Sequence, residues 1–347
     1  MRSPTLLKPL FRAAAALVLC TPGVHAHTFC VTNATSLQLA LLVSSDGGAY
    51  EGEANIIRVA TGTYSIGTLS NQTFHYTNTG TGALNLQGGW NTTCTVRTQK
   101  AELTILDGNH ANQVLSLDQV AGEVDVSALT IQNGETTLRG GGLSINSGVS
   151  DNSRPVVFGN IVRNNHTTNY GGGVNVYSGT ANMGFQNNVI AHNSADLGVA
   201  AGELVGNNVL GIYNNTVAYN TTSTAGGTGG LYVYAGTSNG FVNNNIFWGN
   251  SNCGVELNSA NVRLDHNDFG SRCGTTPLTE IDDYNVAPQF VDVAGNDFHL
   301  ASNSPLIGTI VAFVSQIDPD GNKGPSTGLS DRGAYFETVF ADGFEGN

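Results

Sequence analysis

The sequence predicts an all-β protein folded as a right-handed parallel β-helix, a solenoid with three short strands in each coil. A short strand pattern marked by Asn recurs through the middle of the chain at steps of 31, 28, 27, 30 and 22 residues. Two further strand patterns recur in phase with it, one of them preceded by Gly. A fixed order of strands repeated at this period is typical of a solenoid. The copies of the first pattern begin at Leu129, Asn160, Asn188, Asn215, Asn245 and Asn267.

Each repeat contains short runs in which apolar and polar residues alternate, as in Val174–Val176 and Leu231–Val233. This alternation predicts half-buried strands, and the Asn, Gly, Ser and Thr between them predict turns. One coil cannot bury its apolar side alone, but coils stacked about 4.8 Å apart share one core. A sandwich would instead show hairpins with two-residue turns.

The recurring Asn residues suit the corners of such coils. Asn tolerates left-handed backbone, and its side-chain amides can hydrogen-bond to the next coil when they stack in register. We therefore expect ladders of Asn side chains along the solenoid, at left-handed corner positions.

Residues 1–26 have the order of a secretory signal peptide. Three cations, Arg2, Lys8 and Arg12, precede a short apolar run, and Val24-His25-Ala26 follows. This pattern predicts cleavage after Ala26 and export of the mature chain, which would be secreted or held at the cell surface. The apolar run is too short for a membrane helix, so we expect no transmembrane segment.

The mature chain divides into three predicted regions. We expect residues 27–52 to form an N-terminal cap, residues 53–310 to form the coils, and residues 311–347 to form a C-terminal cap with a short tail. Within the first region, Ser36–Val43 has helical spacing, and Ser36 is its expected N-cap. We expect this short helix to cover the open N-terminal end of the coils.

The charge of the chain excludes some partners. The whole chain has 13 Lys and Arg against 26 Asp and Glu, and the signal peptide contains three of the cations. The mature chain therefore has a net charge of −16. Nucleic-acid binding needs clustered Lys and Arg, so we expect no nucleic-acid partner. A strongly acidic chain also repels polyanionic substrates.

Four cysteines remain after cleavage, and an even number in an exported chain predicts disulfides. Three pairings are open to four cysteines. We favour Cys30–Cys94 and Cys253–Cys273, because each pair is nearest in sequence and one lies at each end of the repeats. No cysteine has the spacing of a zinc site.

Two parts of the chain resemble a known superfamily. Ile57-Arg58-Val59 followed by Gly62-Thr63-Tyr64 looks like the first coil of the pectin-lyase-like β-helix superfamily. The region 286–337, which includes Pro288–Asp292 and Asp331–Glu337, resembles the bacterial choice-of-anchor Q proteins. That resemblance implies an extracellular β-helix and no particular activity. Arg332 replaces an apolar residue of the family ending and Phe336 is inserted, so we expect the last strand to be displaced.

Catalytic candidates are few. The best is Arg263 with Asp265 and Asp268, which slightly resembles an element of pectate lyases, although Asp, His and Asn also suit a coil turn. Asp196 and Glu203 are expected to share an edge with Asp265 and Asp268 if a hydrolase site exists. Asp282 and Asp283 are expected in the turn that leads to the C-terminal region, away from the ladder.

One candidate cation site follows from the sequence. Asp318-Pro319-Asp320-Gly321-Asn322 places oxygen ligands at alternate positions, which suits Ca²⁺. The position that should supply Glu in an EF-hand is Leu329, and Pro-Asp-Gly is first of all a turn. No other cofactor is expected.

Aromatic residues on successive strands are the binding candidates. Tyr232 and Tyr234 lie two residues apart and so share one face of a strand. They point either outward, where they would stack on sugar rings, or inward, where they would fill the core. The other members of the set are Tyr177, Tyr213, Tyr219 and Trp248.

Three functions remain after these observations. The first is a monomeric secreted or surface β-helix that binds polysaccharide or cell-surface glycan along its flat face without catalysis. The second is a polysaccharide lyase or glycoside hydrolase with an atypical acidic site. The third is a structural spacer. The low charge density, the abundant Asn and Gly, and the family resemblance favour the first.

Overall fold

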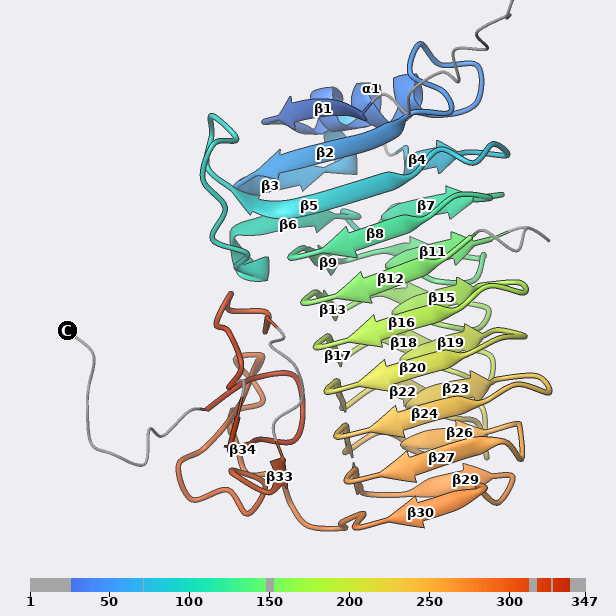
Figure 1. Cartoon of the computed structure of the whole chain (residues 1–347), viewed down its shortest axis with the longest axis vertical. Coiled ribbons are helices and arrows are strands. Elements are labelled where there is room, and N and C mark those ends of the chain that lie inside the picture. Colours follow the sequence, from blue (N-terminus) through green and yellow to red (C-terminus); the bar gives the residue numbers. More distant parts are fainter. Residues whose placement is uncertain (1–25, 71, 148–152, 312–316, 326, 338–347) are drawn as a thin grey trace, which may run out of the picture.

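The chain forms a β-solenoid whose coils stack along one long axis (Figure 1). A computed structural model describes residues 26–70, 72–147, 153–311, 317–325 and 327–337. The predicted all-β parallel fold is confirmed, because the main sheets consist of parallel strand pairs joined from coil to coil. The predicted signal peptide lies almost wholly outside the described residues.

Three long sheets form the walls of the solenoid, and we call them sheets A, B and C. Sheet A has ten strands: β1 (Ala26–Val31), β2 (Ala54–Ala60), β5 (Leu84–Trp90), β8 (Val124–Ser127), β12 (Pro155–Phe158), β16 (Met183–Gln186), β20 (Leu210–Tyr213), β24 (Gly240–Asn243), β27 (Val262–Asp265) and β30 (Thr279–Ile281).

Sheets B and C have eight strands each. Sheet B consists of β3 (Gly62–Ser65), β6 (Thr104–Asp107), β9 (Thr130–Gln132), β13 (Ile161–Arg163), β17 (Val189–Ala191), β21 (Thr216–Ala218), β25 (Ile246–Trp248) and β28 (Asp268–Phe269). Sheet C consists of β4 (Phe74–Thr77), β7 (Leu115–Asp118), β11 (Leu143–Asn146), β15 (Val174–Tyr177), β19 (Gly202–Val205), β23 (Leu231–Tyr234), β26 (Val255–Leu257) and β29 (Arg272–Gly274).

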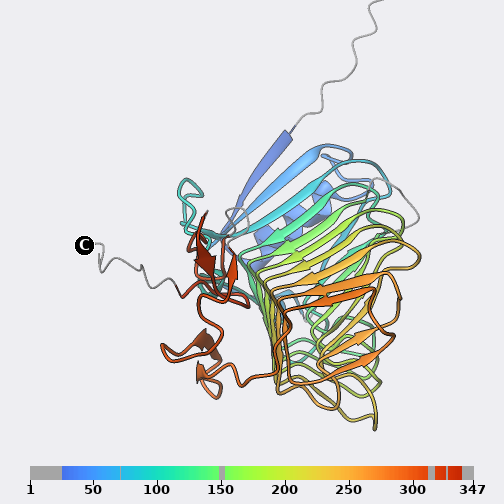
Figure 2. The ribbon, with the colours of Figure 1, turned by 60° about the horizontal axis from the view of Figure 1, so that its bottom comes forward.

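A smaller four-stranded sheet, sheet D, lies between sheets B and C in each of the middle coils. Its strands are only two residues long: β10 (Glu135–Thr136), β14 (His166–Thr167), β18 (Ser194–Ala195) and β22 (Thr221–Thr222). Seen with the lower end turned forward, the coils form a stack of similar closed loops (Figure 2).

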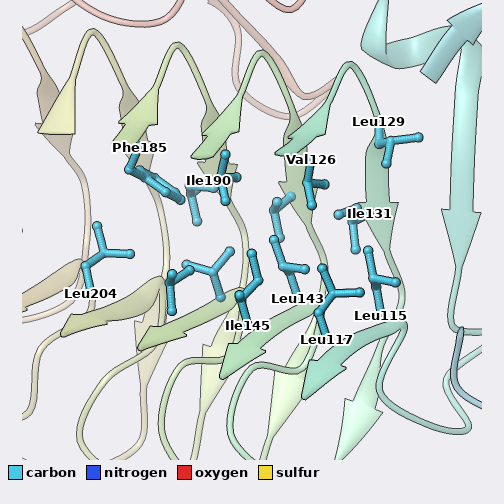
Figure 3. Close-up of a cluster of buried hydrophobic side chains, with 14 of the residues drawn as sticks. Leu115, Leu117, Val126, Leu129, Ile131, Leu143, Ile145, Phe185, Ile190 and Leu204 are labelled. Atoms are coloured by element: carbon cyan, nitrogen blue, oxygen red, sulfur yellow. The ribbon is translucent and has the colours of Figure 1, made fainter. Parts of the chain in front are cut away.

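The interior of the solenoid is one apolar core. Side chains at alternate strand positions point inward, so that Leu143, Val174 and Leu231 stack in one row of sheet C. Val126, Ile131 and Phe185 meet these rows from the other sheets (Figure 3). A single continuous cluster runs from the N-terminal coil to Phe269, as expected when coils bury their apolar sides only by stacking.

Two ladders of Asn side chains run through the corners, and their coil-to-coil hydrogen bonds confirm the prediction. In the first, Asn188 donates through its backbone and side-chain N–H groups to Oδ1 of Asn215, at 2.9 and 3.0 Å. The second connects Asn165, Asn193, Asn220 and Asn250 in the same way. The first contains Asn160, Asn188, Asn215, Asn245 and Asn267.

The expected left-handed backbone lies one residue away from the ladder positions. The residue before each ladder Asn has a positive φ, for example 53° at Asn214 and 54° at Tyr219. The corner therefore turns at that residue, which leaves the following Asn to reach across to the next coil. Asp283 also differs from expectation, because its Oδ1 accepts both donors of Asn267 and so ends the first ladder.

The N-terminal end is covered as predicted, with different boundaries. Helix α1 (Ala34–Ser44) buries Leu37 and Leu41 against the first coils. Its N-cap is Asn33, and Ser36 is the third helical residue, which completes a capping box. The parallel ladder begins before the predicted limit, since β1 pairs with β2.

The C-terminal region lies along the side of the solenoid. The parallel strands end at Ile281, earlier than the predicted limit near 310. The described parts of residues 286–337, here called the C-terminal segment, contain the antiparallel pairs β31 (Phe290–Asp292) with β32 (Asp297–Leu300) and β33 (Ile310–Val311) with β34 (Leu329–Ser330). They pack against the outside of sheet B, as Figures 1 and 2 show. Asp331–Glu337 forms no strand.

Both predicted disulfides are present. Cys30 pairs with Cys94 and Cys253 with Cys273, at Cα–Cα distances of 5.6 and 6.1 Å. The first joins β1 to the loop after β5, and the second joins the last two coils near sheet C. Two short 3₁₀ helices, η1 (Ile66–Leu69) and η2 (Ala101–Leu103), complete the elements.

Candidate functional site

The outer face of sheet C carries rows of polar and aromatic side chains. Its strands pair without a register shift, so side chains at equivalent positions form straight rows across the coils. One outward row contains His75, Ser116, Ser144, Asn175, Glu203, Tyr232 and Glu256. A second contains Asn146, Tyr177, Val205 and Tyr234.

Both predicted binding tyrosines lie on this face. Leu231 and Val233 of β23 are fully buried, whereas Tyr232 and Tyr234 alternate with them and are half-buried on the outside. The inward alternative is therefore wrong for this pair. The Tyr232 hydroxyl accepts a hydrogen bond from the amide of Asn258 in the next coil. Burial raises the pKa of Tyr232, so its phenol stays protonated at neutral pH.

Glu203 is the least exposed acid of this face, with a relative exposure of 6%. Its carboxylate forms an ion pair with Arg139, whose guanidinium lies 4.9 Å from the ring centroid of Tyr170. Burial raises the pKa of Glu203, and Arg139 opposes this rise through its charge and hydrogen bond. Arg139 is thus held between the carboxylate of Glu203 and the ring of Tyr170.

A second carboxylate lies beyond Tyr232. Glu256 is paired with Tyr232 in the strand register and accepts a hydrogen bond from the hydroxyl of Thr228. Because Tyr232 is also paired with Glu203, the two acids lie on opposite sides of one phenol. Two strand spacings place their Cα atoms roughly 10 Å apart. This arrangement offers hydrogen-bond acceptors on both sides of an aromatic ring.

Sequence reasoning missed the role of Glu203 in this row. The coil that contains Gly202-Glu203-Leu204-Val205 lacks an obvious glycine triplet, and so it escapes alignment with its neighbours. Alignment on its Asn ladder residues would have placed Glu203 beside Tyr232. Arg139 carries no such signal, because it reaches Glu203 from a loop two coils away.

The three catalytic candidates do not form one site. Arg263 and Asp265 lie on the outside of sheet A, where Arg263 donates to Asn239 at 3.0 Å and Asp265 bonds to His266. Asp268 lies on sheet B beneath the C-terminal segment and accepts from the backbone N–H of Val286 at 2.9 Å. Burial raises the pKa of Asp268 to about 6.

The wider acidic edge expected from the sequence is also absent among these residues. Asp196 follows sheet D, Glu203 belongs to sheet C, Asp265 to sheet A and Asp268 to sheet B. Residues that are neighbours in the repeat therefore point in different directions, because each coil turns a corner between its strands.

In the candidate Ca²⁺ loop, a carboxylate oxygen accepts hydrogen bonds from the backbone of the loop itself. Oδ1 of Asp318 accepts from the backbone N–H groups of Asp320 and Asn322, at 3.0 and 2.7 Å. Asp320 pairs with His299 at 3.2 Å, and this hydrogen bond lowers the pKa of the Asp320 carboxyl. The described residues contain no group of three or more His, Cys, Asp or Glu side chains placed to hold a metal ion. Of the two alternatives for residues 318–322, a Ca²⁺ loop and a turn, these contacts favour the turn.

Comparison with protein-family models, with curated proteins and with solved structures finds no match to this chain. In the part of the chain that the structure describes, no helix has the length and apolarity needed to cross a membrane. The two disulfides are compatible with an extracellular protein.

Proposed function

We propose that this chain is an exported, monomeric β-helix protein that binds a glycan along the outer face of sheet C without catalysis. The observation that carries the proposal is the pair of outward rows on that face. In one row Tyr232 lies between Glu203 and Glu256, and Asn175 precedes Glu203. The other row contains Asn146, Tyr177, Val205 and Tyr234. Phenol rings stack on sugar rings, and the amides and carboxylates match sugar hydroxyls as donors and acceptors.

Non-catalytic binding agrees with the separation of the catalytic candidates. Arg263, Asp265 and Asp268 lie on two different sheets, and Asp268 is covered. The acidity of the chain favours a neutral glycan over a polyanionic one.

We further propose that the chain belongs to the pectin-lyase-like superfamily and ends like the choice-of-anchor Q proteins. Tyr64 of the resembling first coil is buried, and its hydroxyl donates to the backbone oxygen of Val31 or Ala60, both 2.9 Å away. In the resembling C-terminal region, Arg332 is also buried, with its guanidinium 3.8 Å from the ring centroid of Tyr284. The buried Tyr64 supports the resemblance of the first coil, whereas Arg332 departs from the family ending and is accommodated by its contact with Tyr284.

The test is binding of the mature chain, from His27 onward, to an array of neutral and acidic glycans. We expect the double variant Tyr232→Ala/Tyr234→Ala to lose about tenfold or more in affinity for any glycan that binds. Tyr213→Ala is the matched control, because Tyr213 has the corresponding outward position on sheet A. Equal loss in the control, or no loss in the double variant, would contradict the proposal.

One observation favours a second candidate, a glycoside hydrolase. Glu203 and Glu256 flank Tyr232, and a raised pKa is the property required of a general acid. Release of reducing sugar from the same glycans would support this candidate if Glu203→Gln and Glu256→Gln abolish it. Binding without release of product would leave the non-catalytic proposal standing.

A further inference from the structure

A recess of about 290 Å³ lies near the C-terminal end of the solenoid, at the edge of sheet B. It exists because the last coil takes a shorter path. Phe247 is paired with Phe269 and Val255 with Arg272. Six residues separate β25 from β26 in one coil, and only two separate β28 from β29 in the next. The longer corner of the preceding coil is therefore left uncovered.

The recess combines an aromatic wall with small residues. Trp248 and Phe247 line it together with Gly249, Gly254 and Gly270. Gly249 has φ = 66°, and a Cβ there would come within 2.6 Å of the Tyr219 ring, so glycine is needed for the fold. Gly270 is different. Its φ is ordinary, and a Cβ would lie 3.5 Å from Trp248, in normal contact.

The second Asn ladder ends at this recess. At every earlier rung, the Asn donates its backbone N–H and one side-chain N–H to Oδ1 of the next Asn, as Asn220 donates to Asn250 at 3.0 and 2.9 Å. The last coil is too short to provide another Asn. Asn250 keeps its bond to the oxygen of Val217, and its backbone N–H has no acceptor in the described part of the chain.

The other ladder shows what completes such an end. There the last Asn, Asn267, donates both N–H groups to one carboxylate oxygen of Asp283, at 2.6 and 3.0 Å. A single oxygen atom at the corresponding place beside Asn250 would accept the same two hydrogen bonds. Because Asn250 lines the recess, a bound molecule can supply that oxygen.

We propose that this recess binds one pyranose residue of a glycan. An oxygen substituent of the sugar ring accepts the two hydrogen bonds from Asn250, and the apolar side of the ring packs against Trp248. A sugar provides both an acceptor oxygen and a C–H face, and the volume suits a single ring rather than a long chain. The site is separate from the outer face of sheet C, so the two proposals can fail independently.

The fluorescence of Trp248 provides the readout. The chain contains two tryptophans, and the indole N–H of Trp90 is buried without a hydrogen-bond partner among the described residues, so Trp90→Phe is a mild change. The experiment titrates this single-tryptophan variant with the methyl glycosides of glucose, galactose, N-acetylglucosamine and galacturonic acid, each up to about 50 mM. At least one should change the Trp248 emission in a saturable way.

Gly270→Val tests the location of the site. Its added methyl groups fill the recess beside Trp248 and should weaken the binding of that sugar about tenfold or more. Thr276→Val is the matched control on the same coil, since Thr276 is exposed and does not line the recess. Thermal unfolding of both variants should match that of the parent, which separates loss of binding from loss of fold.

Amide NMR shifts distinguish the two sites. The backbone N–H of Asn250 should shift on binding, while that of Asn220, which has a protein acceptor, should shift less. Tyr232→Ala/Tyr234→Ala should leave this response intact. No emission change with any sugar, or a response that Gly270→Val leaves unchanged, would overturn the proposal.

Discussion

At the scale of single residues, the Asn ladders do more than mark the repeats. Each buried Asn links its coil to both neighbours: Asn215 accepts from the backbone N–H of Asn188 and donates to the oxygen of Phe185 in the preceding coil, and it donates to the side-chain oxygen of Asn245 in the next coil. The turn itself is made by the preceding residue, which takes the left-handed conformation. Separation of these two tasks explains why the residue before the ladder varies from Asn to His and Tyr while the ladder position stays Asn.

The ladder predicts a large local effect on stability. Asn215→Ala should lower the free energy of unfolding by about 3 kcal/mol, because buried donors of Asn188 and the oxygen of Phe185 lose their partner. Urea unfolding followed by circular dichroism measures this change. Asn285→Ala, at an exposed position, is the control and should change stability by less than about 0.5 kcal/mol. Equal effects would show that the ladder bonds add little.

At the scale of elements, the C-terminal segment is held by a compact ionic cluster. His299 bonds to Asp297 at 2.6 Å and to Asp320 at 3.2 Å, and its ring stacks on Tyr335 with centroids 3.8 Å apart. Burial alone would lower the pKa of His299, but the bonds to Asp320 and Asp297 and the charge of Glu337 raise it to about 9. His299 is therefore protonated in the folded chain at neutral pH.

This cluster predicts a pH dependence with a defined sign. The pKa of His299 is higher in the folded chain than its usual 6.5, so its stabilisation is complete below about pH 6.5 and is lost as the pH rises through about 9. The free energy of unfolding should fall by about 2 kcal/mol between pH 7 and pH 9.5. His299→Gln should remove most of this dependence, and an unchanged slope would contradict the assignment.

At the scale of the whole molecule, the two ends of the core are closed differently. Helix α1 covers the N-terminal end. In the last coil, Arg272 and Glu280 take the strand positions that Val255 and Leu264 occupy in the coil before, and they form an ion pair at 3.1 Å. Charges at core positions discourage another chain from adding a coil to the open edge, which is a known protection of edge strands.

We therefore expect the charges at the last coil to prevent end-to-end association of two chains. Arg272→Val/Glu280→Leu would make the exposed end apolar and should cause end-to-end association, measured by light scattering coupled to size-exclusion chromatography. The exchanged pair Arg272→Glu/Glu280→Arg keeps both charges and should keep the association state of the parent. A monomeric apolar variant would show that the ion pair does not prevent stacking.

Much of this fold follows from local patterns. Apolar alternation, the period of the Asn residues and the cysteine spacing predicted the parallel solenoid, the amide ladders and the Cys253–Cys273 and Cys30–Cys94 pairs. The solenoid, the ladders and the Cys253–Cys273 pair depend on residues of the same coil or of the next one, and so a repeating sequence records them directly. Cys30 and Cys94 are 64 residues apart, and their pairing followed from the number and order of the cysteines.

The sequence by itself determined the repeat, its core and the outward direction of polar strand positions. Only the tertiary structure decided which outward residues share a face, because the turn angle at each corner separates Asp265 from Asp268 and brings Glu203, Tyr232 and Glu256 into one row. It also decided that the C-terminal segment covers sheet B, since contacts such as Ala334 with Thr216 join residues more than a hundred positions apart. Such contacts leave no periodic trace in the chain.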